Sequence, residues 1–153
     1  MSFAVQSSAF GSGAEIPKKF TCEGPDVSPA LEWSGVPQGT ATFALIADDP
    51  DAPVGTWVHW VIWNMSPDTH GLPEAVPRSA QLDTGAQQGD NDFRKIGYDG
   101  PCPPAGKAHR YFFRLYALDR KLDLPAGSRR KDLDSAMKGH VLAQAEYMGT
   151  FRR

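Results

Sequence analysis

Two histidines of the sequence stand in apolar runs and could carry chemistry together with a nearby carboxylate. His59 lies in the run GTWVHWVIWN, and His109 opens the run HRYFFRLYAL. A third run, ATFALIADD, ends at Asp49. Two imidazoles and a carboxylate can hold a metal ion, an imidazole with a carboxylate can act as a general base, and polar groups above an apolar floor can bind a small ligand. The spacing of the three residues does not select one of these chemistries.

Five short apolar runs are predicted to form the strands that position these residues. They lie at 2–5, 30–33, 41–49, 57–64 and 109–118. The last two runs are rich in aromatic residues, which strands favour, and turn-forming segments such as DPDAP separate the runs. The sequence therefore predicts several consecutive strands without helices between them.

Side chains of a strand alternate between its two faces, so the polar residues can be placed without a structure. One face of the Trp-rich run is predicted to carry Trp57, His59, Val61 and Trp63, and the other Val58, Trp60 and Ile62. His109 and Tyr111 share a face, and Asp49 ends an apolar face of its own run. If these strand ends meet, the two histidines, Tyr111 and Asp49 line a small polar pocket. Taken singly, a strand histidine is more often a hydrogen-bonded core residue, and Asp49 beside Pro50 is as easily a turn residue.

The rest of the chain predicts one long irregular segment and one helix. Residues 65–108 are rich in Gly, Pro, Asp and Gln, and a connection of this length in a compact domain is usually functional. Apolar residues recur every four positions from Leu133 to Ala145, which predicts a helix within 129–148. Together the elements predict a mainly β fold, an antiparallel β-sandwich with a peripheral C-terminal helix, as a single domain over 1–153.

Composition limits the partners and the compartment. The net charge is −2 with 22% charged residues, which gives no reason to expect nucleic acid or an anionic membrane surface as partner. No apolar stretch approaches the roughly 20 residues of a membrane span, and no signal-peptide pattern opens the chain, so we expect a cytoplasmic protein without stable membrane insertion. In a reducing cytosol Cys22 and Cys102 are expected to be free thiols rather than a disulfide.

Several motifs can be excluded, and two enzyme hypotheses stay open. The segment GPCPPAGKA is not a phosphate-binding P-loop, because five residues separate Gly100 from Gly106 and Ala108 replaces the required Ser or Thr. No G-x-S-x-G or H-E-x-x-H motif is present. A two-histidine, one-carboxylate metal site and a His–Asp general base remain as alternatives. Cys102 could be a nucleophile, although an unreactive loop thiol is the more common case.

Several ordered segments carry a resemblance to a known family. DDPDAP, WVHWVIWN and GPCPPAGKAHRYFFRLYALD resemble the signature segments of the phosphatidylethanolamine-binding protein family. SPALEWSGVP and GHVLAQAEYMGTF extend the resemblance, which runs from Ser2 to Phe151. The chain is most similar to the bacterial and archaeal branch, often called Raf-kinase-inhibitor-like proteins.

The resemblance implies an antiparallel β-sandwich with a small anion-binding pocket at one end. Carried over by motif, the ligand-binding residues are Asp49, Asp51, Trp57, His59, Pro103, Pro104, His109 and Tyr111. The implied function is that of a cytoplasmic, non-catalytic protein that binds phosphate or a phosphorylated head group such as phosphoethanolamine, without a cofactor or metal. Modulation of a protein partner such as a kinase is a further implication, and the aromatic content is compatible with a homodimer. The alternative is a hydrolase or a metal-dependent enzyme that uses the same His and Asp residues.

Overall fold

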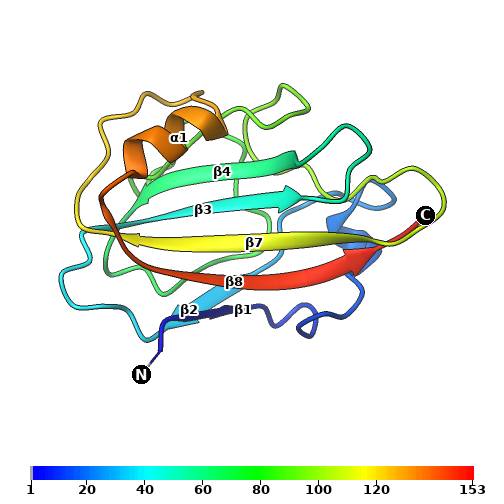
Figure 1. Ribbon diagram of the computed structural model, residues 1–153, viewed down its shortest axis with the longest axis horizontal. Helices are drawn as coiled ribbons and strands as arrows, with labels where there is room; N and C mark the ends of the chain where they lie inside the picture. The colour runs from blue at the N-terminus through cyan, green and yellow to red at the C-terminus, as the bar shows by residue number, and fades with distance from the viewer. Residues whose placement is uncertain (1) are drawn as a thin grey trace.

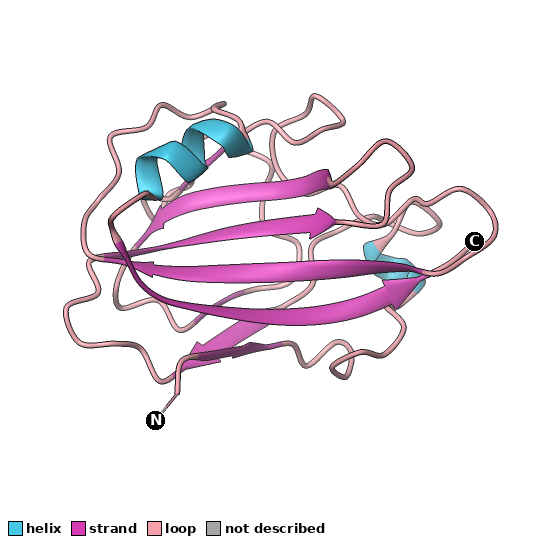
Figure 2. Ribbon diagram, viewed as in Figure 1, coloured by secondary structure: helices cyan, strands magenta, loops and turns pink. Residues whose placement is uncertain are grey.

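The computed structural model describes residues 2–153 and contains two antiparallel sheets packed face to face. The smaller sheet has the order β1-β2-β5, and the larger has the order β6-β4-β3-β7-β8 (Figures 1 and 2). The strands are β1 (Ala4–Gln6), β2 (Leu31–Ser34), β3 (Thr42–Asp49), β4 (Trp57–Met65), β5 (Gly71–Leu72), β6 (Gln87–Gln88), β7 (His109–Leu118) and β8 (Val141–Phe151). A 3-10 turn, η1 (Lys18–Phe20), and a helix, α1 (Arg130–Met137), complete the elements. The predicted antiparallel β-sandwich is confirmed, and each of the five predicted runs overlaps a strand.

Both faces of the larger sheet are covered, which explains why its central strands are apolar on both sides. The core between the two sheets is built from side chains such as Trp33 of β2, Phe43 and Leu45 of β3, and Phe113 of β7. A second core lies on the other face, where Leu133 and Met137 of α1 pack on side chains of β3, β4 and β7. Every residue of β3 is buried as a result.

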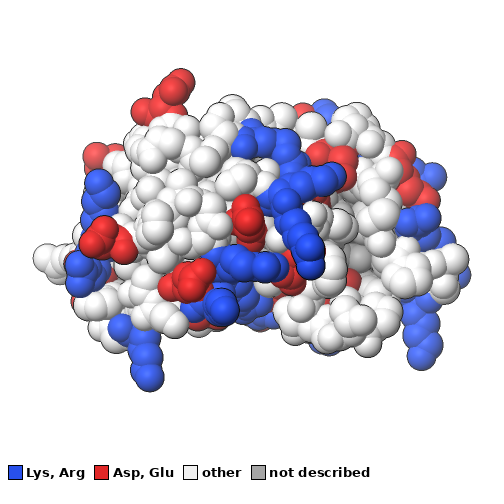
Figure 3. Space-filling view, turned by 90° about the horizontal axis from the view of Figure 1, so that it is seen from above, with Lys and Arg blue, Asp and Glu red and all other residues white. Residues whose placement is uncertain are grey.

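The outer face near α1 is charged. Figure 3 views the molecule from this side and shows Lys and Arg side chains beside Asp and Glu side chains across the middle of the face. The largest group centres on Asp48, which is 1% exposed and forms ion pairs with Arg114 at 3.0 Å and Arg130 at 2.7 Å. Among residues 2–153, no helix is long and apolar enough to cross a membrane.

The predicted C-terminal helix is correct only in its first part. The helix α1 ends at Met137, and Gly139 follows with a φ of 83°, a backbone conformation that glycine adopts readily. The residues from Val141 on form β8, which pairs with β7 along its length, from Leu118↔Val141 to His109↔Phe151. The four-residue apolar repeat therefore spans two elements, and the ladder with β7 overrides the local helical periodicity.

A β-bulge changes the predicted faces of β4. Ala47 pairs with Trp60, whereas the next residue of β3, Asp48, pairs with Val58, so His59 is the extra residue. The bulge places His59 on the inter-sheet side together with Trp60, while Val61 packs in the core beneath α1. The predicted grouping of His59 with Val61 and Trp63 is therefore wrong. Bulges often re-aim a side chain beside a binding or active site, and sequence alternation cannot reveal them.

Candidate functional site

A cavity of about 230 Å³ opens where the ends of three strands meet. Asp49 is the last residue of β3, Trp57 the first of β4 and His109 the first of β7, so their side chains converge at one end of the large sheet. This is the end on the right in Figure 1. The lining residues are Asp49, Ala52, Pro53, Val54, Trp57, His59, Phe93, Cys102, Pro103, Pro104, His109 and Tyr111.

Most of the residues predicted from the sequence lie at this cavity, and one does not. Those that line it are Asp49, Trp57, His59, Pro103, Pro104, His109 and Tyr111. Asp51 instead accepts two hydrogen bonds from the Arg110 guanidinium, at 2.9 and 2.8 Å. These hydrogen bonds lower the pKa of Asp51 to about 2. Asp51 is therefore part of a surface ion pair that neighbours the cavity.

Several lining residues have no counterpart in the sequence prediction. Phe93 comes from the long 65–108 segment, and its ring lies edge-on to both Trp57 and His59, at 5.5 and 5.3 Å between ring centroids. Val54 is 82% exposed at the rim of the cavity. Neither residue carries a polar group or a periodic pattern; for Phe93 the available signal was that the long segment is usually functional, and Val54, which lies before that segment, had no such signal.

His109 and Asp49 form a buried pair at the cavity. Nδ1 of His109 lies 2.7 Å from Oδ2 of Asp49, and the two residues are 9% and 3% exposed. The other carboxylate oxygen, Oδ1, accepts a hydrogen bond of 2.8 Å from the backbone N–H of Asp51. Because a carboxylate accepts and does not donate, Nδ1 of His109 carries the proton. The Asp49 side chain thus fixes the tautomer of His109.

His59 is held in the same tautomer by a different acceptor. Its Nδ1 donates to the carbonyl oxygen of Asp99 over 2.6 Å. Asp99 is fixed in turn through its carboxylate, which accepts from Asn91 at 2.7 Å and from Arg78 at 2.9 Å. Burial lowers the pKa of His59 below its ordinary value of 6.5, against the raising effect of the Asp99 carbonyl and of nearby carboxylates. His59 is therefore neutral at pH 7.

The second ring nitrogen of each histidine is left for the cavity. Among residues 2–153, every buried side-chain nitrogen or oxygen has a hydrogen-bond partner. Within the same residues, the Nε2 atoms of His59 and His109 have no hydrogen-bond partner. Each Nε2 must therefore reach open space, and the open space that both rings line is the cavity. In the neutral imidazole this atom is an acceptor, and it becomes a donor only when the ring gains a proton.

Tyr111 supplies a hydroxyl that stays protonated. Its ring lies edge-on to His59 at 5.3 Å and stacks on His109 at 6.4 Å between centroids. Burial and the negative charge of Asp49 raise the pKa of the Tyr111 hydroxyl well above its usual value. The polar groups of the cavity are thus two imidazole nitrogens, one phenol and one carboxylate, within walls of proline, valine and aromatic side chains.

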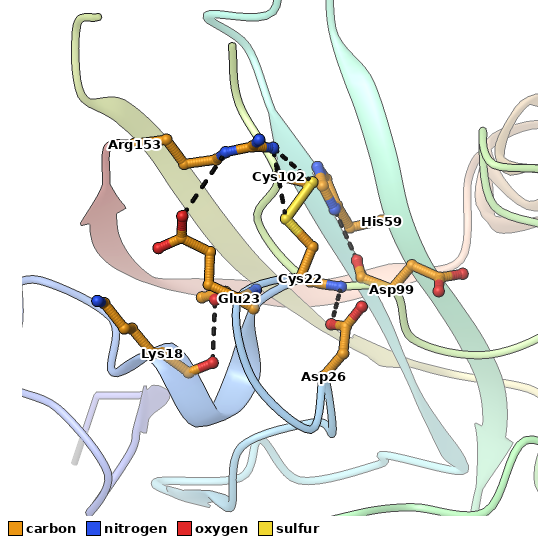
Figure 4. Close-up of a disulfide and its surroundings, with 10 residues drawn as sticks. Lys18, Cys22, Glu23, Asp26, His59, Asp99, Cys102 and Arg153 are labelled. Carbon is orange, nitrogen blue, oxygen red and sulfur yellow. Dashed lines mark hydrogen bonds and ion pairs between the residues drawn. A yellow bond between two sulfur atoms is a disulfide. The ribbon is translucent and has the colours of Figure 1, made fainter. Parts of the chain in front are cut away.

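The expectation of free thiols is wrong, because Cys22 and Cys102 form a disulfide across 80 positions of sequence. Hydrogen bonds bring the two segments together, from the backbone N–H of Cys22 to the Pro101 carbonyl at 3.1 Å and from Gly100 N–H to the Asp26 carboxylate at 2.7 Å. Figure 4 shows the disulfide with Asp26 beside it. Cys102 lines the cavity in this oxidised form and is no free nucleophile.

The histidines and carboxylates do not converge as metal ligands. No group of three or more His, Cys, Asp or Glu side chains in residues 2–153 is arranged to hold a metal ion. The Nδ1 atoms of both histidines are already engaged with oxygen acceptors of the protein. The geometry therefore gives no support to the two-histidine, one-carboxylate metal site.

Comparisons with known proteins agree with this architecture. The sequence model of the family described as phosphatidylethanolamine-binding protein matches residues 6–152. A UPF0098 protein of Methanothermobacter thermautotrophicus is 51% identical over 97% of this chain and 98% of its own length. A UPF0098 protein of Aquifex aeolicus is 48% identical over 97% of this chain and 88% of its own length.

Solved structures show the same fold. A phosphatidylethanolamine-binding protein homologue from Chlamydia trachomatis superposes with a TM-score of 0.90 at 40% identity, covering 99% of this chain and 97% of that one. Escherichia coli YbcL, described as a new member of the mammalian family of these proteins, superposes with a TM-score of 0.92 at 35% identity. That match covers 99% of this chain and 98% of YbcL.

Proposed function

The chain belongs to the phosphatidylethanolamine-binding protein family, and we propose that its cavity binds a small phosphate-bearing or similar anionic group while His109 takes up a proton. The observation that carries this proposal is the engagement of both Nδ1 atoms, which leaves only Nε2 of each histidine for a ligand. An anion needs donors, and the neutral imidazoles offer acceptors at that position. Binding and protonation are therefore linked.

His109 is the residue that we expect to take the proton. The Asp49 carboxylate accepts the Nδ1 proton of His109 at 2.7 Å, so a proton gained at Nε2 would lie on a ring already paired with a carboxylate. A bound anion at Nε2 would add a second negative charge on the other side of the ring. His59 has no carboxylate in direct contact with its ring, and burial keeps it neutral.

The neutral ring of His59 extends the proposal to ligands that also carry a donor. Its Nε2 can accept from an ammonium group or from the hydroxyl of a hydrogen phosphate. The cavity, at about 230 Å³, is smaller than the roughly 300–1,000 Å³ of sites for drug-sized ligands. A head group such as phosphoethanolamine fits these limits better than an entire lipid, whose chains would leave past the exposed Val54 at the rim.

The enzyme alternative has one observation in its favour, the His109–Asp49 pair, which is arranged as a general base would be. However, the residues that line the cavity include no Ser or Thr hydroxyl, and Cys102 is oxidised. We therefore favour binding without turnover. Modulation of a protein partner such as a kinase, the cytoplasmic location and a homodimer stay predictions.

Titration calorimetry with sulfate tests the proposal, because sulfate is a tetrahedral anion that stays fully ionised near pH 7. Repeating the titration in two buffers with different ionisation enthalpies counts the protons taken up. We expect uptake approaching one proton per sulfate for the wild-type protein, and tighter binding of phosphoethanolamine than of sulfate. Binding without proton uptake, or hydrolysis of a phosphate ester, would contradict the proposal.

The substitution His109→Ala should remove the charged donor and weaken sulfate binding by roughly 1.5–3 kcal/mol. His140→Ala is the matched control. His140 contacts Asp119 through Nδ1 at 2.9 Å, so it repeats the His–Asp pair outside the cavity. Equal sulfate affinity in the two variants would show that the anion binds elsewhere.

A further inference from the structure

The Cys22–Cys102 disulfide occupies the wall of the cavity and is accessible from outside. Cys102 lines the cavity next to Pro103 and Pro104, and both cysteines are exposed residues. Buried structural disulfides are protected from thiols by their surroundings, whereas an exposed one can be attacked. The bond therefore combines access for a small thiol with contact to the proposed binding site.

A cation lies against the sulfur atoms. Nη1 of Arg153 is 3.1 Å from Sγ of Cys102 and 3.7 Å from Sγ of Cys22, and the Arg153 side chain also approaches Glu23 at 3.8 Å. Figure 4 shows the guanidinium reaching over the disulfide. In thiol exchange, one sulfur of the disulfide is attacked and the other leaves as a thiolate. The exchange is faster when the leaving thiolate is better stabilised. The closer guanidinium makes Cys102 the favoured leaving group.

Opening the bond would leave the two segments docked. Tyr98 donates its hydroxyl to the carbonyl of Phe20 at 2.7 Å, and Gly100 donates its N–H to Asp26. A Cβ at Gly100 would meet the Phe20 carbonyl oxygen at 1.9 Å, so the backbones are in close contact there without the disulfide. The freedom gained on opening is therefore confined to the stretch that carries Cys102 and the two proline walls.

We propose that Cys22–Cys102 is a thiol-exchange site that loosens the cavity wall when it opens. The thiolate of a low-molecular-weight thiol attacks Sγ of Cys22, a new S–S bond forms there, and Cys102 leaves with the electron pair of the broken bond as a thiolate beside Arg153. A second thiolate attacks the sulfur of the first thiol, releases it as a small-molecule disulfide and frees the Cys22 thiolate. The exchange itself is independent of the ligand, and its effect on anion affinity rests on the proposed function.

Mass spectrometry of the folded protein treated with millimolar glutathione tests the exchange. After acid quenching and alkylation, we expect glutathione on the peptide that contains Cys22 and a free, alkylated Cys102. Arg153→Gln should slow the reaction several-fold and reduce this preference, whereas Arg152→Gln, at the neighbouring exposed position, should leave both unchanged. A disulfide that opens only in denaturant, or an Arg153→Gln rate equal to that of the wild type, would overturn the proposal.

Sulfate affinity of the oxidised and the fully opened protein tests the effect on the cavity. We expect affinity to fall about two- to tenfold on opening, since the wall residues must be ordered again on binding. The double variant Cys22→Ser, Cys102→Ser should match the opened protein. Unchanged sulfate affinity on opening would overturn the link between the disulfide and the cavity. If the oxidised protein binds no sulfate, the proposed function is wrong, and the glutathione experiment still tests whether the disulfide is an exchange site.

Discussion

Two neighbouring carboxylates, Asp48 and Asp49, end β3 and point to opposite faces of the large sheet. Both are buried, at 1% and 3% exposure. Two guanidinium groups hold Asp48. Arg114 donates to both carboxylate oxygens of Asp48, and Arg130 donates to one of them. Asp49 has the imidazole of His109 and one backbone N–H instead. One carboxylate faces permanent cations, and the other faces a group that can gain or lose its charge.

The difference separates a structural site from a site that can respond. Arginine is charged at every physiological pH, so the charges around Asp48 do not change and the group can only hold β3, β7 and α1 together. The partner of Asp49 is an imidazole, which can exist with or without a positive charge, so a ligand at Nε2 of His109 can alter the charge of the ring. The alternation of side chains along a strand is therefore enough to place two different electrostatic environments one residue apart.

Asp48→Asn should have the largest effect on stability. The substitution removes the buried counter-charge that Arg114 and Arg130 share and leaves them only the more exposed Glu146 and Asp134, and breaking such a buried pair usually costs up to about 3–5 kcal/mol. Urea denaturation measures the loss, and calorimetry on the folded variant should show sulfate affinity close to that of the wild type. If sulfate affinity falls as far as in His109→Ala, the two faces of the sheet are not independent.

His59 should make the free energy of unfolding depend on pH. Its pKa is lowered in the folded protein, so below 6.5 the unfolded chain binds a proton that the folded chain does not, and stability falls as the pH falls. The slope from one such group is at most about 1.4 kcal/mol per pH unit. Denaturation of the wild type and of His59→Gln at pH 7.5 and 5.5 measures it. If the free energy of unfolding falls more between pH 7.5 and 5.5 in the variant than in the wild type, His59 is not the source of the pH dependence.

Asp51→Asn should have the smallest effect, because its partner Arg110 lies at the surface. The pKa of Asp51 is lowered to about 2 from 3.8, so the ion pair stabilises the fold above pH 3.8 and loses this contribution as the pH falls to about 2. Sulfate affinity should change little, because Asp51 does not line the cavity. A loss of affinity comparable to that of His109→Ala would return Asp51 to the binding site.

The residues on β3 and β7 could be placed from the sequence because these strands pair without a shift over most of their length. Regular pairing preserves alternation, so His109, Tyr111 and Asp49 lie on the predicted faces. On β4 the extra residue at His59 breaks the alternation. His59 lines the cavity despite this error, because the bulge turns its side chain toward it, for which alternation alone gave no reason.

The disulfide and β8 could not be predicted for a different reason. Cys22 meets Cys102 only because distant segments dock, and no local pattern encodes that contact. Val141 and Ala145 fit a helical repeat, yet their partners are Leu118 and Leu115 of β7, more than twenty positions earlier. Long-range pairing determines the secondary structure of such segments, whereas the periodicity of a single sequence reports only the local preference.

The central claim, that an anion in the cavity is bound together with a proton on His109, is tested most directly by NMR of the imidazole nitrogens. Long-range ¹H–¹⁵N spectra at pH 7 report the protonation of Nδ1 and Nε2 of each histidine, before and after saturation with phosphate. We predict that Nε2 of His109 changes from unprotonated to protonated, while His140 does not change. An unprotonated Nε2 in the phosphate-saturated protein, or spectra that do not respond to phosphate at His59 and His109, would contradict the account.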